Sequence, residues 1–162
     1  RTTYYYDADN RKKSAYIYRH NPVQSRLEYY HSYSYEGEVE IESVYTDREK
    51  TNRTECSRRI YDEQGRETRH ERIQYMDVPR NYGEEDKDTK QAYKTTITET
   101  HYGIFGELLH NETTEYNAKK EVTSHSLYQI RYTKYNSLGL PVAGIQTEWQ
   151  RQQSFTIEYT FY

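Results

Sequence analysis

The sequence is poor in the residues that usually stabilise a small domain from inside. Leu, Ile, Val and Phe make up about 15% of its 162 residues, below the roughly 20% under which highly charged chains stay disordered. A single cysteine, Cys56, excludes an internal disulfide and a cysteine-rich metal site. No apolar run approaches the roughly 18 residues of a membrane-spanning helix, so we expect no membrane span in this chain.

Tyrosine and threonine are what the chain has instead. There are 21 Tyr and 18 Thr, both of which favour strands, and each Tyr supplies a large apolar surface with a polar tip. The 23 basic and 26 acidic residues nearly balance, which argues against disorder driven by self-repulsion. We therefore predict an all-β globular domain in which tyrosine supplies much of the core.

The balance of charge also bears on partners. The net charge is −3 and the isoelectric point is about 6.1, whereas nucleic-acid-binding domains usually concentrate Lys and Arg on one basic face. We expect no nucleic-acid partner. The sequence begins with Arg1 rather than Met, so we expect a processed or trimmed chain, for which a removed export signal is one explanation.

Apolar and polar residues alternate along several segments, as in half-buried strands. The alternation is clearest at residues 154–161 and recurs at 39–45 and 122–132. No stretch of a dozen residues has a helical period with caps. We predict about ten antiparallel strands in a meander, forming one domain over residues 1–162 in a curved or two-layer sheet. The polar segments 20–26, 77–90 and 150–153 are the expected longer loops, and 77–90 is the candidate mobile segment.

A turn pattern recurs between the predicted strands. Tyr is followed by Asp, Asn or Gly, then by two free residues, and then usually by Gly or Asn. Asp or Asn at the second position bonds a backbone N–H two residues on, and Gly or Asn at the fifth accepts a positive φ, so the pattern predicts a tight hairpin. We call it the Tyr-Asp turn. Its predicted structural residues are Tyr61, Asp62, Gly65, Tyr102, Gly106, Tyr135, Asn136 and Gly139, with further copies at Tyr6 and Tyr116.

The segment from Tyr61 to Thr68 resembles the YD repeat of RHS-type bacterial proteins, whose unit reads Tyr-Asp, two residues, Gly-Arg, one residue, Thr. The whole chain is similar to small exported bacterial envelope proteins of unknown function that use this hairpin. The resemblance implies an antiparallel sheet, a bacterial source and an extracytoplasmic location: periplasmic, envelope-anchored or secreted. It implies no catalytic residues. RHS shells around toxins are much longer and more regular, so that function is not carried over.

Signatures of catalysis are missing from the sequence. There is no nucleophile elbow, phosphate-binding loop or zinc-protease helix, and we expect neither an enzyme nor a cofactor. Three residues, Glu99, His101 and His110, have two interpretations: a metal site, or an accidental grouping on a solvated face. If the turn after Tyr102 closes a four-residue hairpin, Glu99 pairs with His110, and both share a face with His101. We favour the accidental grouping.

Acidic residues alternate at Glu38, Glu40 and Glu42, which places them on one face of the sheet. The simplest interpretation is a solvated surface with cross-strand Arg or Lys partners. Glycosidase-type catalysis would need two opposed carboxylates in a cleft, and the sequence shows no cleft.

Two functions remain open. The first is a non-enzymatic structural or interaction module of the cell envelope or the secreted proteins. The alternative is a glycan- or peptide-binding module that uses exposed Tyr together with Trp149 and Tyr159. Neither terminal strand contains Pro or a run of Lys, so we also expect an edge-strand homodimer through residues 155–162, or coverage of that edge by the chain itself. We favour a two-layer sheet over a closed barrel.

Overall fold

The computed structural model describes residues 1–20, 25–77, 90–148 and 151–158. Within these ranges all regular structure is β-strand, which confirms the predicted fold class. No helix there is long and apolar enough to cross a membrane. The strands are β1 (Thr2–Tyr6), β2 (Lys12–His20), β3 (Ser25–Glu36), β4 (Val39–Tyr45), β5 (Arg53–Tyr61), β6 (Glu67–Asp77), β7 (Lys90–Tyr102), β8 (Leu108–Asn117), β9 (Val122–Tyr135), β10 (Pro141–Glu148) and β11 (Arg151–Thr156).

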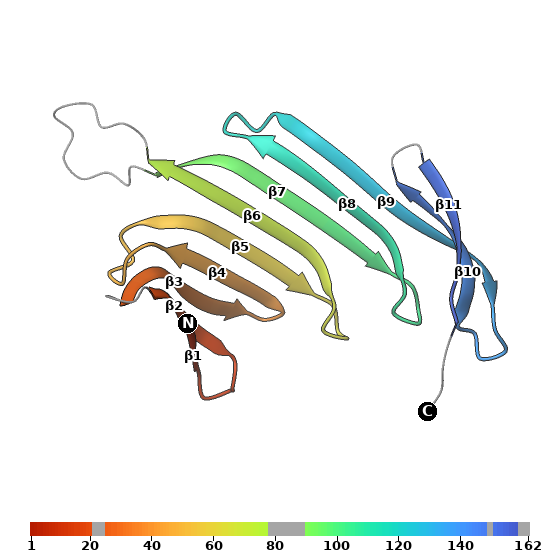
Figure 1. Cartoon of the computed structure of the whole chain (residues 1–162), viewed down its shortest axis with the longest axis horizontal. Helices are drawn as coiled ribbons and strands as arrows, with labels where there is room; N and C mark the ends of the chain where they lie inside the picture. Colours follow the sequence, from red (N-terminus) through yellow and green to blue (C-terminus); the bar gives the residue numbers. More distant parts are fainter. Residues whose placement is uncertain (21–24, 78–89, 149–150, 159–162) are drawn as a thin grey trace.

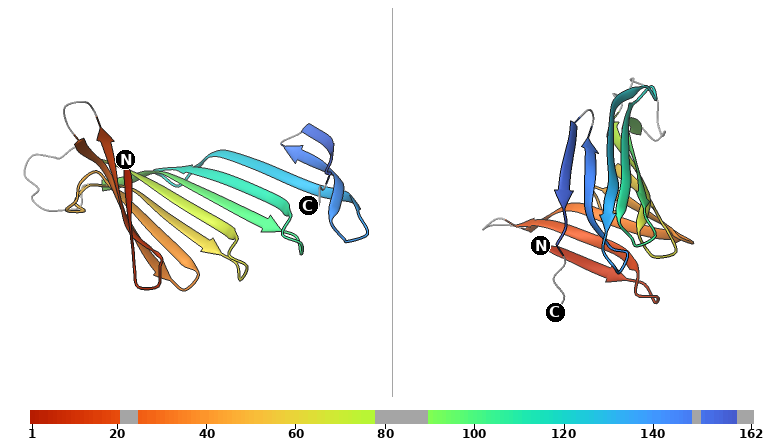
Figure 2. Two further views of the ribbon diagram at one scale, coloured as in Figure 1. Left: turned by 60° about the horizontal axis from the view of Figure 1, so that its bottom comes forward. Right: turned by 90° about the vertical axis from the view of Figure 1, so that its right-hand side faces the viewer.

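The strands form one antiparallel meander in sequence order, from β1 at one edge to β11 at the other (Figure 1). Extensive contact between described strands is confined to sequence neighbours, and the sheet does not close into a barrel. The two views of Figure 2 show a single twisted layer whose end strands cross the direction of the central ones. Of the two expected forms, the curved sheet is therefore the one observed, and neither the two layers nor the barrel to which we preferred them is formed. Both faces carry many polar side chains, so little apolar area would be buried by folding the sheet over.

Because the sheet is one layer, its core is thin. Among the described residues the buried hydrophobic side chains are Ala15 and Tyr30, and the buried polar ones are Ser14 and Ser57. Most other side chains in the strands are half-buried. Each face is thus protected by side chains that lie across neighbouring strands, and the stability of the sheet depends on contacts within each face.

Five hairpin turns share the geometry expected of the Tyr-Asp turn. Between β5 and β6, the N–H of Gly65 donates to the carbonyl of Asp62, and the N–H of Asp62 donates to the carbonyl of Arg66, both at 2.9 Å. One carboxylate oxygen of Asp62 also accepts the N–H groups of Gln64 (3.0 Å) and Arg66 (2.9 Å). Gly65 has a φ of 75°, a left-handed conformation that favours glycine. The two backbone bonds recur in the turns that follow Tyr6, Tyr61, Tyr102, Tyr116 and Tyr135.

The turn between β7 and β8 reaches the same geometry without an Asp or Asn. Gly103 takes the position of Asp62, and the carboxylate of Glu107 enters the space that a side chain at Gly103 would fill. The Oε2 of Glu107 accepts the N–H of Phe105 at 2.9 Å, a bond that Asp62 makes in the other turn with its own side chain. The turn therefore keeps a carboxylate acceptor, supplied from its other end.

The predicted loops fit the structure unevenly. The longer connections around residues 21–24 and 78–89 lie outside the described residues, so the predicted mobility of 77–90 stays a prediction. The predicted polar loop at 150–153 is wrong in part, because Arg151 to Gln153 pair with β10 as the start of β11. Their side chains are exposed, since an edge strand of a single-layer sheet has no neighbouring layer to cover it, and polarity therefore gave a false loop signal here.

Candidate functional site

The predicted ligand pair cannot be placed, because both Trp149 and Tyr159 lie outside the described residues. The tyrosines that the structure describes are mostly half-buried. Three exposed ones are consecutive in β1, with exposed fractions of 48% at Tyr4, 52% at Tyr5 and 53% at Tyr6. Successive residues of a strand point to opposite faces, so these three form no flat platform on which a sugar could stack.

The metal trio that we considered less favoured than an accidental grouping is not assembled in the predicted register. The hairpin register shifts by one residue beside the turn, so that His101 lies opposite His110 and Glu99 lies opposite Glu112. The predicted pairing of Glu99 with His110 is therefore wrong by two residues, because Tyr102 pairs with Leu108 rather than Glu107 and Leu109 is an extra, bulged residue of β8. Among the described residues no group of His, Cys, Asp and Glu is arranged to hold a metal ion.

The predicted trio has other partners instead. The rings of His101 and His110 meet edge to face at 5.2 Å between centroids. Glu99 accepts a hydrogen bond from Arg69 at 2.7 Å. Glu99 and His101 line a depression of about 440 Å³ beside the β5–β6 and β7–β8 turns, in which the carboxylate of Glu99 is already paired.

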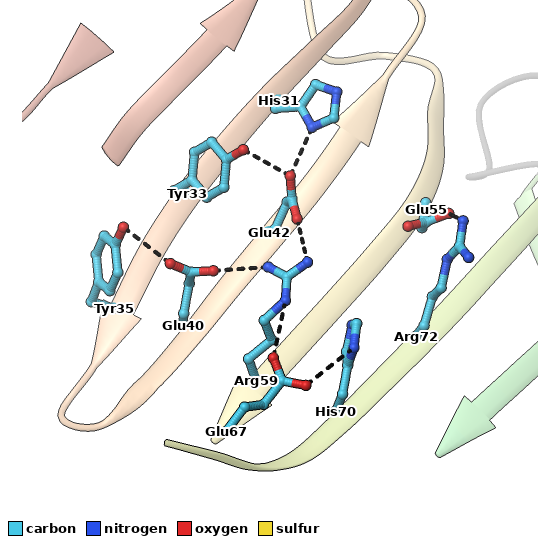
Figure 3. A network of polar contacts seen from close by, with 10 residues as sticks. All are labelled: His31, Tyr33, Tyr35, Glu40, Glu42, Glu55, Arg59, Glu67, His70 and Arg72. Carbon is cyan, nitrogen blue, oxygen red and sulfur yellow. Dashed lines mark hydrogen bonds and ion pairs between the residues drawn. The ribbon is translucent and has the colours of Figure 1, made fainter. Parts of the chain in front are cut away.

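The largest cluster of charged side chains lies on the face of β3 to β6 that also carries Glu40 and Glu42 (Figure 3). Arg59 lies directly opposite Glu40 across β4 and β5. Its Nη1 donates to Oε1 of Glu40 at 2.8 Å, and its Nη2 donates to Oε2 of Glu42 at 2.9 Å. One guanidinium thus joins both carboxylates, which are only 15% and 12% exposed. The predicted cross-strand partner exists, but these carboxylates are largely buried rather than solvated.

Further donors complete the cluster. The hydroxyl of Tyr33 donates to Oε1 of Glu42 at 2.8 Å, and Nδ1 of His31 lies 2.7 Å from the same oxygen. On the β6 side, Glu67 lies 3.7 Å from Nε of Arg59 and 3.6 Å from Nδ1 of His70. We call this set the ionic cluster. Its members are His31, Tyr33, Tyr35, Glu40, Glu42, Arg59, Glu67 and His70.

Glu42 is the electrostatic centre of the ionic cluster. Burial alone would raise its pKa, but the hydrogen bonds from His31, Tyr33 and Arg59 lower the pKa to about 2. Burial, reinforced by the bond to Glu42, raises the pKa of the Tyr33 hydroxyl above its usual range. Glu42 therefore stays ionised at neutral pH, and a general acid would need a raised pKa instead. The cluster is a set of ion pairs and hydrogen bonds that ties four strands together, and within it Nε2 of His31 and Nε2 of His70 are buried without a hydrogen-bond partner.

The opposite face of β1 to β4 carries a continuous row of tyrosines. Adjacent ring centroids are 5.6 Å apart for Tyr5 and Tyr16, 4.8 Å for Tyr16 and Tyr30, and 6.2 Å for Tyr30 and Tyr45. The loop between β4 and β5 folds over this row, and its cations Arg48 and Lys50 lie 5.4 Å and 5.3 Å from the rings of Tyr16 and Tyr30. Tyr16 and Tyr30, in the middle of the row, are therefore covered by the chain itself, as expected where tyrosine replaces aliphatic core residues, whereas Tyr5 at its end is 52% exposed.

Large, exposed apolar side chains cluster at the tips of two turns. The side chains of Ile104 and Phe105, between β7 and β8, are 91% and 52% exposed, and Leu138, between β9 and β10, is 66% exposed. Phe105 spans the space between the two turns, because a Cβ atom built on Gly139 would lie 3.1 Å from its ring. We call Ile104, Phe105 and Leu138 the apolar corner.

The apolar corner was not recognised from the sequence, although a signal for it is present. The two free positions of the Tyr-Asp turn are polar or small in three copies, as in Glu63 and Gln64, whereas both are large and apolar in one copy (Ile104 and Phe105) and one is in another (Leu138). Position-by-position comparison of the repeats would have found these residues. Charges of both signs lie beside the corner: Arg66 approaches Gly106, and Glu107 binds the N–H of Phe105.

Comparison with known proteins supports the fold alone. No protein-family model matches the sequence, and no curated protein is significantly similar to it. A crystal structure of a protein with unknown function from Bacteroides fragilis NCTC 9343 is similar, with a TM-score of 0.50 and 14% sequence identity. The similarity covers 78% of this chain and 91% of that chain. At this identity it shows a shared architecture of strands and no shared activity.

Proposed function

We propose that this protein is a non-enzymatic interaction module of an exported or cell-envelope bacterial protein, and that it binds a protein partner through the apolar corner. The observation that carries the proposal is the exposure of large aliphatic side chains at two neighbouring turn tips. Exposed aliphatic side chains in a cluster are typical of surfaces that bind other macromolecules. The bacterial source and the extracytoplasmic location rest on the resemblance of the Tyr-Asp turns to YD repeats.

The composition around the apolar corner favours a protein over a lipid surface. Arg66 and Glu107 place one cation and one anion beside the exposed side chains, and Asp62 binds Arg66 at 2.8 Å. A rim with charges of both signs is typical of protein–protein interfaces, whereas attraction to anionic lipid needs an excess of cations. Two of the three side chains of the apolar corner, Ile104 and Leu138, are aliphatic, and Phe105 supplies its one aromatic ring, so the corner favours an apolar peptide over a glycan, which stacks on aromatic faces.

The non-enzymatic part of the proposal is supported by the chemistry of the ionic cluster. Glu40 and Glu42, the least exposed paired carboxylates described, are both bonded to Arg59. A nucleophile, an acid or a base must have a free atom facing substrate, and these groups instead face one another.

A selection of phage-displayed random peptides tests the proposal directly. The selected peptides should be apolar, and the double variant Ile104→Ser with Leu138→Ser should weaken their binding about tenfold or more, as expected when two anchoring side chains are removed. The matched control is Glu63→Ser with Gln64→Ser, which changes the corresponding tip of the β5–β6 turn. That control should leave binding unchanged.

Three outcomes would contradict the proposal. Selected peptides that bind the apolar-corner variant as well as the unmodified protein would place the binding surface elsewhere. Loss of vesicle binding in the variant, with no selected peptide, would make the corner a lipid contact. Binding on a glycan array that does not depend on the corner would favour the carbohydrate alternative.

A further inference from the structure

The free edge of β1 is unusually open to strand addition. In the described chain β1 pairs only with β2, and its sequence, Thr2 to Tyr6, contains no charge and no proline. Natural edge strands are usually protected by charges, proline, bulges or a covering segment. The other edge strand, β11, begins with the cation Arg151 and continues with two glutamines. β1 is therefore the edge better suited to pairing.

The backbone pairing shows which groups of β1 are free. Arg1 exchanges both of its backbone bonds with Tyr18, at 2.9 Å and 3.1 Å. Bonded and non-bonded residues alternate along an antiparallel pair, so Thr3 and Tyr5 point their backbone groups toward β2. The pairing shifts beyond Tyr5, where Lys13 is an extra residue of β2, but Asp7 again bonds toward that side through the carbonyl of Arg11 at 2.9 Å. Three residues, Thr2, Tyr4 and Tyr6, therefore direct an N–H and a carbonyl away from the sheet. The edge offers three regularly spaced donor and acceptor pairs.

We propose that β1 pairs with β1 of a second copy of this chain, antiparallel and in a register centred on Tyr4. In that register Tyr4 lies opposite Tyr4 of the second copy, and Thr2 lies opposite Tyr6. Each of these pairs exchanges backbone hydrogen bonds, because the outward-pointing residues of one strand meet those of the other. No two like charges face each other across the strands, since the strand carries none.

Charge complementarity favours this register over its neighbours. A two-fold axis at Tyr4 places Arg1 of each copy opposite Asp7 of the other. The half-buried carboxylate of Asp7 already accepts the N–H groups of Asp9 and Arg11 and binds the Arg11 side chain at 3.1 Å, so Arg1 of the second copy would contact the 26% of the side chain that stays exposed. Shifting the register by two residues moves Arg1 away from Asp7 and leaves outward backbone groups unpaired. A continuous sheet across two copies therefore has one best register.

The first experiment measures self-association of the full chain by sedimentation over a series of concentrations. The dimer should dissociate about tenfold or more readily in Tyr4→Pro, because proline removes an N–H that only the second copy uses. The matched control Tyr4→Phe keeps that N–H and should dimerise like the unmodified protein. Circular dichroism should show the same sheet content in both variants, since the bonds to β2 remain.

The second experiment tests the register by oxidation of single-cysteine variants in a Cys56→Ser background. Tyr4→Cys places two thiols on the two-fold axis and should form an intermolecular disulfide, whereas Thr2→Cys faces Tyr6 and should not. A monomer at all concentrations, a dimer that persists in Tyr4→Pro, or equal cross-linking of both cysteine variants would overturn the proposal. The double variant Ile104→Ser with Leu138→Ser should still dimerise, so this test is independent of the apolar corner.

Discussion

The β5–β6 and β7–β8 hairpins are neighbours in the sheet, yet they fill the same face in different ways. Arg59 in β5 lies opposite His70 in β6, and the next residue of that row is Thr98 in β7. Around Arg59 the row is ionic and links four strands (Figure 3). At Thr98 it becomes neutral, with a single hydroxyl contact of 3.1 Å to Thr113 in β8.

This difference separates two ways of covering a sheet that has no second layer. In the ionic cluster each charged group depends on several partners. A half-buried charge that loses its partner has still lost hydration, and nothing then offsets that cost. In the threonine pair each hydroxyl needs one neighbour, and its loss leaves only a small polar group unpaired. Substitutions in the two hairpins should therefore have unequal effects on stability.

The largest effect is expected for Arg59→Met. Removing the guanidinium leaves Glu40 and Glu42 close together without their shared cation, and Glu42 keeps only the bonds from His31 and Tyr33. We expect a cost of roughly 2–4 kcal/mol, near the lower end for a buried ion pair. The matched change in the neutral region, Thr98→Val with Thr113→Val, should cost less than about 1 kcal/mol. Urea unfolding followed by circular dichroism measures both. Equal costs would show that the ionic cluster is no more cooperative than the threonine pair.

The pH dependence of stability should also distinguish the ionic cluster from the threonine pair. The folded pKa of Glu42 is about 2, below its ordinary value of 4.5, so the stabilisation is complete above about pH 4.5 and is lost as the pH falls toward 2. This difference between the two pKa values corresponds to a contribution of about 3 kcal/mol to folding stability at neutral pH. Glu42→Gln should be less stable than the unmodified protein at neutral pH and should show a shallower loss of stability in acid.

Glu99 supplies the control for this measurement, because its ion pair with Arg69 is exposed at 43% on the carboxylate side. Glu99→Gln should leave the acid slope nearly unchanged, since exposed pairs contribute little. If Glu42→Gln and Glu99→Gln gave the same slope, the low pKa of Glu42 would have no part in stability.

The sequence predicted the class and connectivity of the fold because both follow from local patterns. Alternation defined the strand at 39–45 with the limits observed for β4, and the Tyr-Asp pattern marked five of the hairpin turns. Antiparallel neighbours joined by short turns leave little choice of topology. The single layer was harder to predict, because it depends on how much apolar area both faces can bury together.

The side-chain sites were predicted less well, because they depend on register. Two shifts of one residue each moved His110 from Glu99 to His101: the turn pairs Tyr102 with Leu108, and Leu109 forms a bulge. Neither shift is visible in residue spacing. The acidic face was foreseen through Glu40 and Glu42, but the identity of Arg59 as their common partner needed the pairing of β4 with β5.

The smallest effect on stability is expected when a carboxylate acceptor is removed from the β5–β6 turn or the β7–β8 turn. Asp62 supplies the acceptor inside the β5–β6 turn, and Glu107 supplies it inside the β7–β8 turn. Glu107→Ala should therefore destabilise the protein, by roughly 0.5–1.5 kcal/mol for one lost hydrogen bond. Asp62→Ala should also destabilise it, because two backbone N–H groups lose their acceptor.

A double substitution shows whether the two acceptors are equivalent. Gly103→Asp alone brings a second carboxylate into the space held by Glu107, so it should not stabilise the turn. In the Glu107→Ala background that space is empty, and Gly103→Asp should restore most of the lost stability by giving this turn the arrangement of Asp62. Thermal unfolding of the four proteins in this cycle measures the coupling between the two positions. Additive effects would mean that Glu107 does not occupy the role of the missing Asp, and that the turn closes through its backbone bonds alone.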